Sequence, residues 1–230
     1  MEKAGPEPAV TSLRTSDLLF VPFGEHMIAK YSEWFADPYL RKMTSTESLN
    51  LAEATKAQAL WASDPERIMF ILLDRATFQT KENDVASMIG DVNLVTKRNF
   101  DAESFFPGEV ANEEARAEVM LMIAVILVDP DYRGRKLGRQ ALLSIMRFAI
   151  DSMKVSSIEA NISQDNAPSL KLFNSIGFVI EHTSDVFGEI SLRFDINKES
   201  KTKIRDLTDQ LDYHVETLVK HSKDLRVVEQ

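Results

Sequence analysis

The sequence contains no cysteine among its 230 residues. Disulfide bonds, thiol nucleophiles and thiolate metal ligands are therefore excluded. Histidine is also scarce, because the chain has only four, and no two of them are four residues apart as in a helical zinc motif. We therefore expect no bound metal.

Long apolar runs and positive charge are also in short supply. The longest apolar run, Val119–Val128, has ten residues, whereas a helix needs about 20 to cross a bilayer, and the N-terminus has no apolar signal core. The formal net charge is -9 and the sequence pI is near 5.0, which argues against the broad basic surface that nucleic-acid binding requires. We expect a soluble cytoplasmic protein without membrane or nucleic-acid partners.

The length and the 44% share of hydrophobic residues fit one α/β domain with extensions. Residues 1–16 are polar and contain proline, so we predict a flexible N-terminal segment. Residues 17–197 form the predicted domain, and 198–230 form a charged, amphipathic helical tail. The tail places Ile204, Leu207, Leu211, Val215 and Leu218 on one helical stripe. This stripe either packs back on the domain or binds a partner.

Within the domain, strands and helices alternate. The Asn50–Glu53 pair predicts a capping box, Asn166 a helix N-cap, and Gly177 a helix end. Residues 117–128 are too apolar for a strand with a wet face, so this strand should be central. After residue 74, and from Lys97 to Glu114, we predict surface loops. The predicted strands are 17–23, 67–74, 87–96, 117–128, 156–163, 178–186 and 189–196, and the predicted helices are 25–37, 51–62, 137–153 and 167–176.

A cationic turn stands out in this acidic chain, between the central strand and the helix that follows it. A turn before a helix offers free backbone N–H groups and the helix dipole to an anion. It is not a nucleotide P-loop, because Leu137 follows Lys136 where a serine or threonine is needed. The spacing of Gly134 and Gly138 also fails the dinucleotide fingerprint. The alternative is a basic surface turn that caps a helix. The cations are Arg133, Arg135, Lys136 and Arg139.

The turn resembles the R-x-x-[G]-x-G motif of the GNAT acetyltransferase superfamily, with Arg133, Gly134 and Gly138 in place. The resemblance implies that the turn's amides hold the pyrophosphate of acetyl-CoA, while the basic side chains, Arg135, Lys136 and Arg139, add charge. Lys136 occupies a position where the family has glycine, so one close backbone approach to the pyrophosphate is in doubt.

A second block, Asn166–Phe178, resembles another GNAT motif and lies at the expected distance from the turn. A capped amphipathic helix would explain its caps but not its pairing with the first motif. The resemblance assigns Asn166, Ser169 and Phe173 to the cofactor site. Many members have a tyrosine where this chain has Phe173, and phenylalanine cannot protonate a leaving thiolate.

Further blocks narrow the resemblance to the N-acetyltransferase 9 family, from about Leu18 to Phe194. Among them are the segments that begin at Leu18, Leu60 and Met88. The implied architecture is an α/β (α+β) GNAT fold, in which helices flank a mixed, mostly antiparallel central sheet.

The resemblance also implies that the strand ending in Leu127 and Val128 offers backbone N–H groups to the cofactor. No catalytic base can be assigned, because relatives have an acid inside this strand, whereas here Met120 or Leu121 takes its place. Val125–Val128 also look like an insertion. Glu118, Asp91 and Asp129 are weak candidates for the base. Two hypotheses stay open: an acetyl-CoA-dependent N-acetyltransferase acting on a protein amine (N-terminal or lysine), or a catalytically weak or inactive binding protein. An association with microtubules, implied by the family, fits either.

Overall fold

The computed structural model describes residues 9–44, 49–98, 119–127, 130–132, 134–153, 155–221 and 224–227. Several predictions concern positions outside these ranges. They are the residues Glu118, Val128, Asp129 and Arg133 and most of the loop predicted from Lys97 to Glu114. The loop prediction was wrong for Lys97 and Arg98, which continue β4 beside β5.

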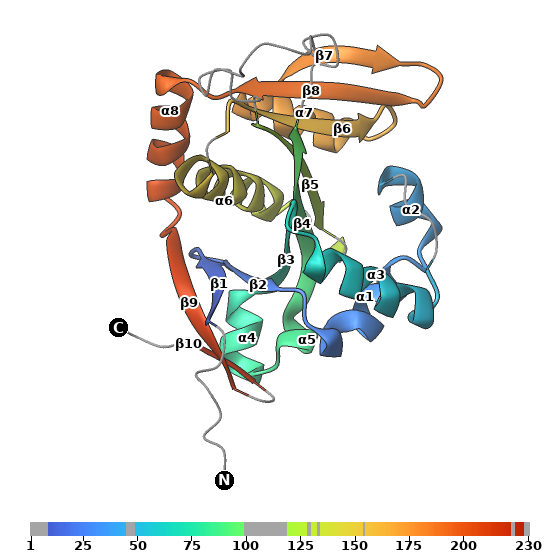
Figure 1. The fold of residues 1–230 in the computed structure, drawn as a ribbon, viewed down its shortest axis with the longest axis vertical. Helices are drawn as coiled ribbons and strands as arrows, with labels where there is room; N and C mark the ends of the chain where they lie inside the picture. The colour runs from blue at the N-terminus through green and yellow to red at the C-terminus, as the bar shows by residue number, and fades with distance from the viewer. Residues whose placement is uncertain are drawn as a thin grey trace, which may run out of the picture.

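A ten-stranded sheet in the order β10-β9-β1-β2-β3-β4-β5-β6-β8-β7 organises the chain (Figure 1). Every neighbouring pair that the structure describes is antiparallel except β5–β6, which is parallel. The predicted mixed, mostly antiparallel sheet is confirmed, and β5 is central as expected. The strands are β1 Ala9–Arg14, β2 Leu18–Pro22, β3 Arg67–Asp74, β4 Met88–Arg98, β5 Val119–Leu127, β6 Ser157–Ser163, β7 Val179–Ser184, β8 Glu189–Asp195, β9 His214–His221 and β10 Asp224–Val227.

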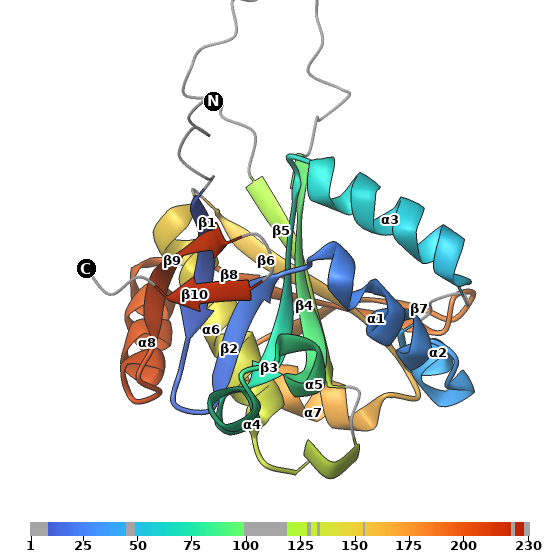
Figure 2. The ribbon, with the colours of Figure 1, turned by 90° about the horizontal axis from the view of Figure 1, so that it is seen from below.

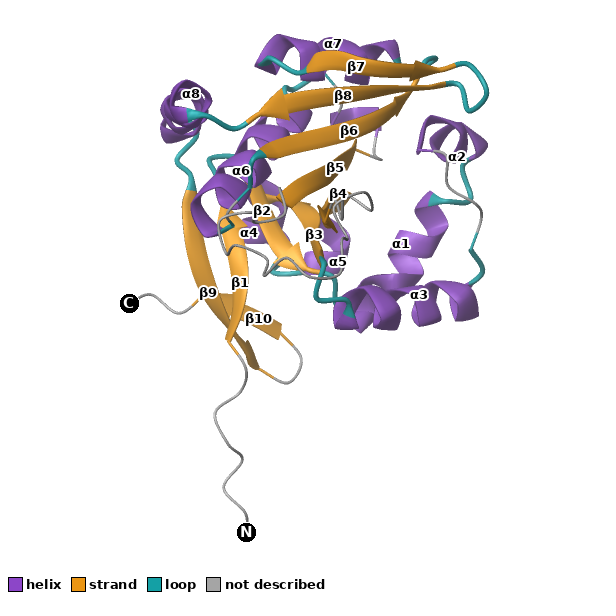
Figure 3. Ribbon diagram, turned by 45° about the horizontal axis from the view of Figure 1, so that its top comes forward, coloured by secondary structure: helices purple, strands orange, loops and turns teal. Residues whose placement is uncertain are grey.

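Helices cover both faces of the sheet. Figure 3 shows α1, α2 and α3 on one side of it, and α6 and α8 on the other. No described helix is long and apolar enough to cross a membrane. The helices are η1 Glu25–Met27, α1 Ile28–Trp34, α2 Pro38–Thr44, α3 Leu51–Ser63, α4 Arg75–Lys81, α5 Asp84–Ser87, η2 Pro130–Tyr132, α6 Leu137–Ser152, α7 Ala167–Ile176 and α8 Lys198–Asp209.

Successive side chains along the strands point to opposite faces of the sheet, and each face has its own hydrophobic core. Val92 and Leu94 of β4 point into a large cluster with α6, while Ile71 and Leu73 of β3 join a smaller cluster with α1. Burying each such side chain contributes about 1.5–3 kcal/mol.

The predicted caps are confirmed, but the polar loop after residue 74 is not. Asn50 and Glu53 form the capping box of α3, Asn166 caps α7, and α7 ends at Gly177, whose φ is 122°. In place of the loop stand α4 and α5, capped by Asp74 and Asn83. Each of these short helices is started by a side-chain cap, and neither is long enough to show a periodic apolar pattern.

Part of the N-terminal segment predicted to be flexible is a strand. Residues 9–14 form β1, which lies between β9 and β2. Ser12 and Leu13 are buried there. The prediction was wrong for these residues because a strand from the far end of the chain supplies the missing hydrogen-bond partners.

The C-terminal tail is helical only in its first part. Helix α8 packs back on the domain with Ile204 buried. Of the two alternatives for the apolar stripe, the α8 part therefore follows the first, packing on the domain. The prediction of helix beyond it was wrong, because β9 and β10 extend the sheet next to β1 (Figures 1 and 2). The segment from Val215 also alternates β-branched residues at 215, 217 and 219, which suits a strand.

Candidate active site

The sheet opens between β5 and β6. Their parallel ladder covers three pairs and ends at Met122–Glu159. Beyond it, β5 continues along β4 to the pair Leu127–Gly90, and β6 continues along β8 to Ser163–Glu189. One edge of each strand therefore has backbone N–H and C=O groups without a described ladder partner. This free edge of β5 runs as far as Leu127, the last described residue of the strand.

Three of the four residues that look inserted, Val125, Ile126 and Leu127, lie in β5 without distorting it. The β4–β5 register stays constant from Arg98–Val119 to Gly90–Leu127, with no bulge. Val125, Ile126 and Leu127 therefore prolong the strand along the opening.

The cationic turn leaves the first turn of α6 open to a ligand. Gly134 has φ 74° and no atom lies within 4 Å of where a Cβ would be. Lys136, the N-cap of α6, has φ 62° and its side chain makes no capping hydrogen bond. A left-handed conformation costs a non-glycine residue about 1–2 kcal/mol, which explains the family's preference for glycine here. Lys136 therefore adopts a conformation that a glycine would adopt at lower cost.

The cations of the turn differ in their partners. The Arg135 guanidinium lies 5.0 Å from the centre of the Tyr132 ring and 3.8 Å from Asp74. Arg139 donates a 3.2 Å hydrogen bond to Ser175 of α7. This bond brings the two sequence motifs together, as their pairing in the family predicts.

The three residues assigned in the second motif occupy different environments. Asn166 accepts a 3.2 Å hydrogen bond from the Ser169 amide, so its side chain serves the cap of α7. Phe173 is 4% exposed and packs edge-on against Phe178 at 4.9 Å between ring centres. Its ring therefore belongs to the hydrophobic core.

The face of the sheet toward α1 and α3 carries polar residues near the opening. Asp91 of β4 is fully buried, and one of its oxygens accepts a 2.6 Å hydrogen bond from Asn93 while the other has no partner. Burial raises the pKa of Asp91 to about 7, and the hydrogen bond from Asn93 lowers it. Glu159 of β6 lies at the last pair of the ladder, within 4.0 Å of Arg193. Sequence reasoning missed Glu159, although its charge at an alternating position of a buried strand could have marked it.

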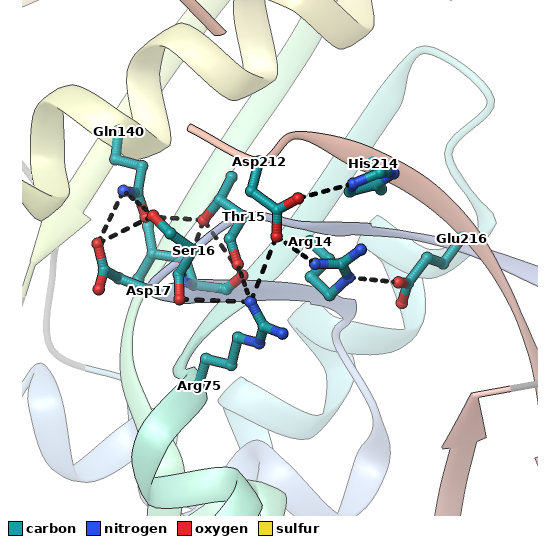
Figure 4. A network of polar contacts seen from close by, with 10 residues as sticks. Arg14, Thr15, Ser16, Asp17, Arg75, Gln140, Asp212, His214 and Glu216 are labelled. Atoms are coloured by element: carbon teal, nitrogen blue, oxygen red, sulfur yellow. Dashed lines mark hydrogen bonds and ion pairs between the residues drawn. The ribbon is translucent and has the colours of Figure 1, made fainter. Parts of the chain in front are cut away.

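A polar network fastens the start of α6 to both ends of the chain (Figure 4). Buried Gln140 accepts a 2.7 Å hydrogen bond from Thr15 and donates a 3.0 Å bond to Asp17. Arg75 donates a 3.0 Å bond to the Thr15 carbonyl and lies 3.6 Å from Asp212 of the tail. The first part of α6, next to the turn, is therefore held by residues that come before the two motifs in the sequence, and these residues in turn contact the tail that comes after them.

Metal chemistry finds no support in this geometry. Within the described ranges, no three histidine or acidic side chains gather as a metal site would require.

Comparison with known families identifies the chain. Residues 17–179 match the acetyltransferase (GNAT) domain. The chain belongs to the GNAT acetyltransferases. A sea anemone protein, the N-acetyltransferase 9-like protein of Nematostella vectensis, is 36% identical over 183 residues, which cover 79% of this chain and 84% of that protein. The alpha/beta-tubulin-N-acetyltransferase 9 of Drosophila melanogaster is 33% identical over 76% of this chain and 82% of its own length. These identities place this GNAT enzyme in the N-acetyltransferase 9 family, and it is an N-acetyltransferase.

Solved structures support the fold. Aminoglycoside acetyltransferase AAC(6')-Ib in complex with coenzyme A superposes with a TM-score of 0.58 at 15% identity, over 85% of this chain and 99% of that one. Spermidine N-acetyltransferase from Vibrio cholerae, in complex with CoA and spermine, also gives 0.58, at 13% identity over 81% and 99% of the two chains.

Proposed function

We propose that this GNAT enzyme transfers the acetyl group of acetyl-CoA to an amine of a protein. The observation that carries the proposal is the opening between β5 and β6, which lies beside the uncapped first turn of α6. A thioester arm placed in the opening would meet unpaired backbone N–H groups that polarise its carbonyl. A pyrophosphate at the helix N-terminus would meet free amides and cations.

The residues of the turn fit such a group. Gly134 and Lys136 both have a positive φ, and the space where a Cβ of Gly134 would lie is open. Arg135 and Lys136 are exposed and add positive charge. We place Arg133, Gly134, Arg135, Lys136, Gly138 and Arg139 in the pyrophosphate site, Leu127 and Val128 at the thioester arm, and Asn166 and Ser169 at the edge of the cofactor. Phe173 acts there only as packing beneath the helix.

We further propose tubulin as the acceptor protein, since two relatives in different animals are named as alpha/beta-tubulin-N-acetyltransferases. With tubulin as the acceptor, we propose that the enzyme acts in the cytoplasm, at microtubules or their subunits. The binding-only alternative is not favoured, because these relatives are named as transferases. The opening between β5 and β6 also supports the transfer.

Calorimetric titration with acetyl-CoA tests the cofactor site. We expect micromolar binding by the parent and at least tenfold weaker binding by the double variant Arg135→Glu/Lys136→Glu, since two charges are reversed beside a pyrophosphate. The control is Lys56→Glu/Lys198→Glu, which changes the net charge equally at two exposed positions elsewhere. Equal acetyl-CoA affinity in both double variants would show that the turn is not part of the cofactor site.

Mass spectrometry of tubulin-derived peptides tests the reaction. A peptide with a free N-terminus and one with a blocked N-terminus and a free lysine are compared with acetyl-CoA as donor. Acetylation of either peptide supports the enzyme, and tight acetyl-CoA binding without acetylation of any tubulin sequence would contradict the proposed acceptor.

A further inference from the structure

Asp91 occupies an unusual place for a carboxyl group. It lies in the interior of β4, opposite Ile71 on one side and Ile126 on the other. Ile126 belongs to the part of β5 that has already left β6, so Asp91 stands one strand away from the opening. A buried carboxyl group in a central strand is costly unless its oxygens are paired.

The surroundings of Asp91 satisfy only half of it. One oxygen takes the hydrogen bond of Asn93, whose own oxygen accepts a 3.4 Å bond from Arg67 of β3. The other oxygen has no hydrogen-bond partner. The buried Tyr31 of α1 lies near enough to interact with this group. Burial raises the pKa of its phenol, and the charge of Asp91 raises it further. No described cation forms an ion pair with Asp91 directly.

We propose that Asp91 is the base that removes the proton from the acceptor's ammonium group during acetyl transfer. The proposal rests on the function proposed above. A carboxyl group whose free oxygen lacks a donor, beside the strand that holds the thioester, fits a site that an incoming N–H group completes, directly or through one water.

The proton balance is simple. The ammonium gives one proton to the Asp91 carboxylate, and the neutral nitrogen bonds the acetyl carbon as the carbon–sulfur bond breaks. The nitrogen loses its second proton and the departing thiolate gains one, so an amide and a thiol leave. Asp91 then releases its proton to solvent, and one proton is produced in each cycle.

The pH dependence of kcat, with both substrates saturating, tests the proposal. We expect the parent to lose activity below about pH 7 as Asp91 becomes protonated. Asp91→Asn should lower kcat by about 10²–10⁴-fold and abolish this acid limb, while acetyl-CoA affinity stays unchanged. Glu159→Gln, a carboxyl replacement near the same opening, should keep the limb.

A second variant makes the test independent of the folding of Asp91→Asn. Because the Asn93 hydrogen bond lowers the pKa of Asp91, Asn93→Leu should move the limb to higher pH. A purely structural role for Asp91 predicts no such shift. The stability of the parent and of Asp91→Asn against pH gives a readout without turnover.

Several results would overturn the assignment: an acid limb that survives in Asp91→Asn, one that disappears in Glu159→Gln, or one that stays in place in Asn93→Leu. These outcomes require an active parent. A parent that neither binds acetyl-CoA nor acetylates either peptide would contradict the proposed function instead, so the two failures are distinguishable.

Discussion

The two faces of the same strands differ sharply in chemistry. Toward α6, β4 and β6 present the buried apolar side chains of Val92, Leu94, Ile158, Ala160 and Ile162. Toward α1 and α3, the alternate positions of these strands carry Asp91, Asn93, Glu159 and Asn161. Period-two alternation makes the division possible, because neighbouring residues point to opposite faces.

The difference separates stability from function. The apolar face gains free energy from burial, whereas a buried carboxyl group on the other face costs free energy. Groups kept against such a cost are where a functional site is expected. The first two predictions below test the two faces, and the last two test the turn and the tail outside them.

The largest effect should be on stability against pH. Burial raises the pKa of folded Asp91 from 3.8 to about 7, so the folded state binds a proton more tightly than the unfolded state. This stabilisation is complete below about pH 4 and is lost as the pH rises through 7. A shift of this size corresponds to roughly 4 kcal/mol. Between pH 4 and pH 8, the free energy of unfolding of the parent should fall by up to this amount relative to Asp91→Asn.

Urea unfolding at several pH values measures this difference. Groups that titrate equally in both proteins cancel, so the difference curve reports Asp91 alone. Parallel curves for parent and variant would show that the carboxyl group is not buried as described.

The apolar face is tested by Leu94→Ala. Leu94 is 1% exposed and belongs to the large core, so the substitution should cost about 2–5 kcal/mol. The matched control is Leu60→Ala on α3, where the leucine is 68% exposed and the change should be within about 0.5 kcal/mol. Equal losses of unfolding free energy at the two positions would contradict the assignment of Leu94 to the buried core and of Leu60 to the surface.

Much of this architecture could be predicted from local patterns. The cationic turn, the Asn50 and Asn166 caps and the Gly177 helix end are visible in sequence, because each depends on residues within one turn of chain. The pairing of β1 with β9 joins residues about 200 positions apart, and no local pattern records it. The segment at Val215 suits a helical stripe and a strand equally, so the neighbouring strand decided its structure.

The site residues also differ in how far the sequence predicts them. The residues of the turn could be predicted from their spacing, whereas the burial and the free oxygen of Asp91 could not. Its burial depends on the helices that cover β4, and its free oxygen depends on which neighbours fail to reach it. Phe173 was assigned to the cofactor from its place in a motif, but its ring fills the core against Phe178.

A smaller effect is expected at the turn, where backbone strain rather than burial is at stake. Lys136→Gly removes a left-handed lysine, which gains about 1–2 kcal/mol, but the flexible glycine returns about half of this in the unfolded state. The free energy of unfolding should rise by about 0.5–1 kcal/mol. Lys136→Ala, which keeps the strain and removes the charge, should give no gain in the same urea series. A gain in both variants would assign the effect to charge.

The smallest effect should come from the polar network that holds the tail. Asp212 lies 2.6 Å from Arg14 and 2.9 Å from His214, but its side chain is half exposed. Solvent screens such pairs, so Asp212→Asn should lower the free energy of unfolding only slightly in urea, and 1 M salt should remove most of the loss. The β1–β9 ladder, with six pairs, is then what holds the tail to the domain. A loss as large as that of Leu94→Ala that persists in high salt would mean that the ion pairs, not the ladder, fix the tail to the domain.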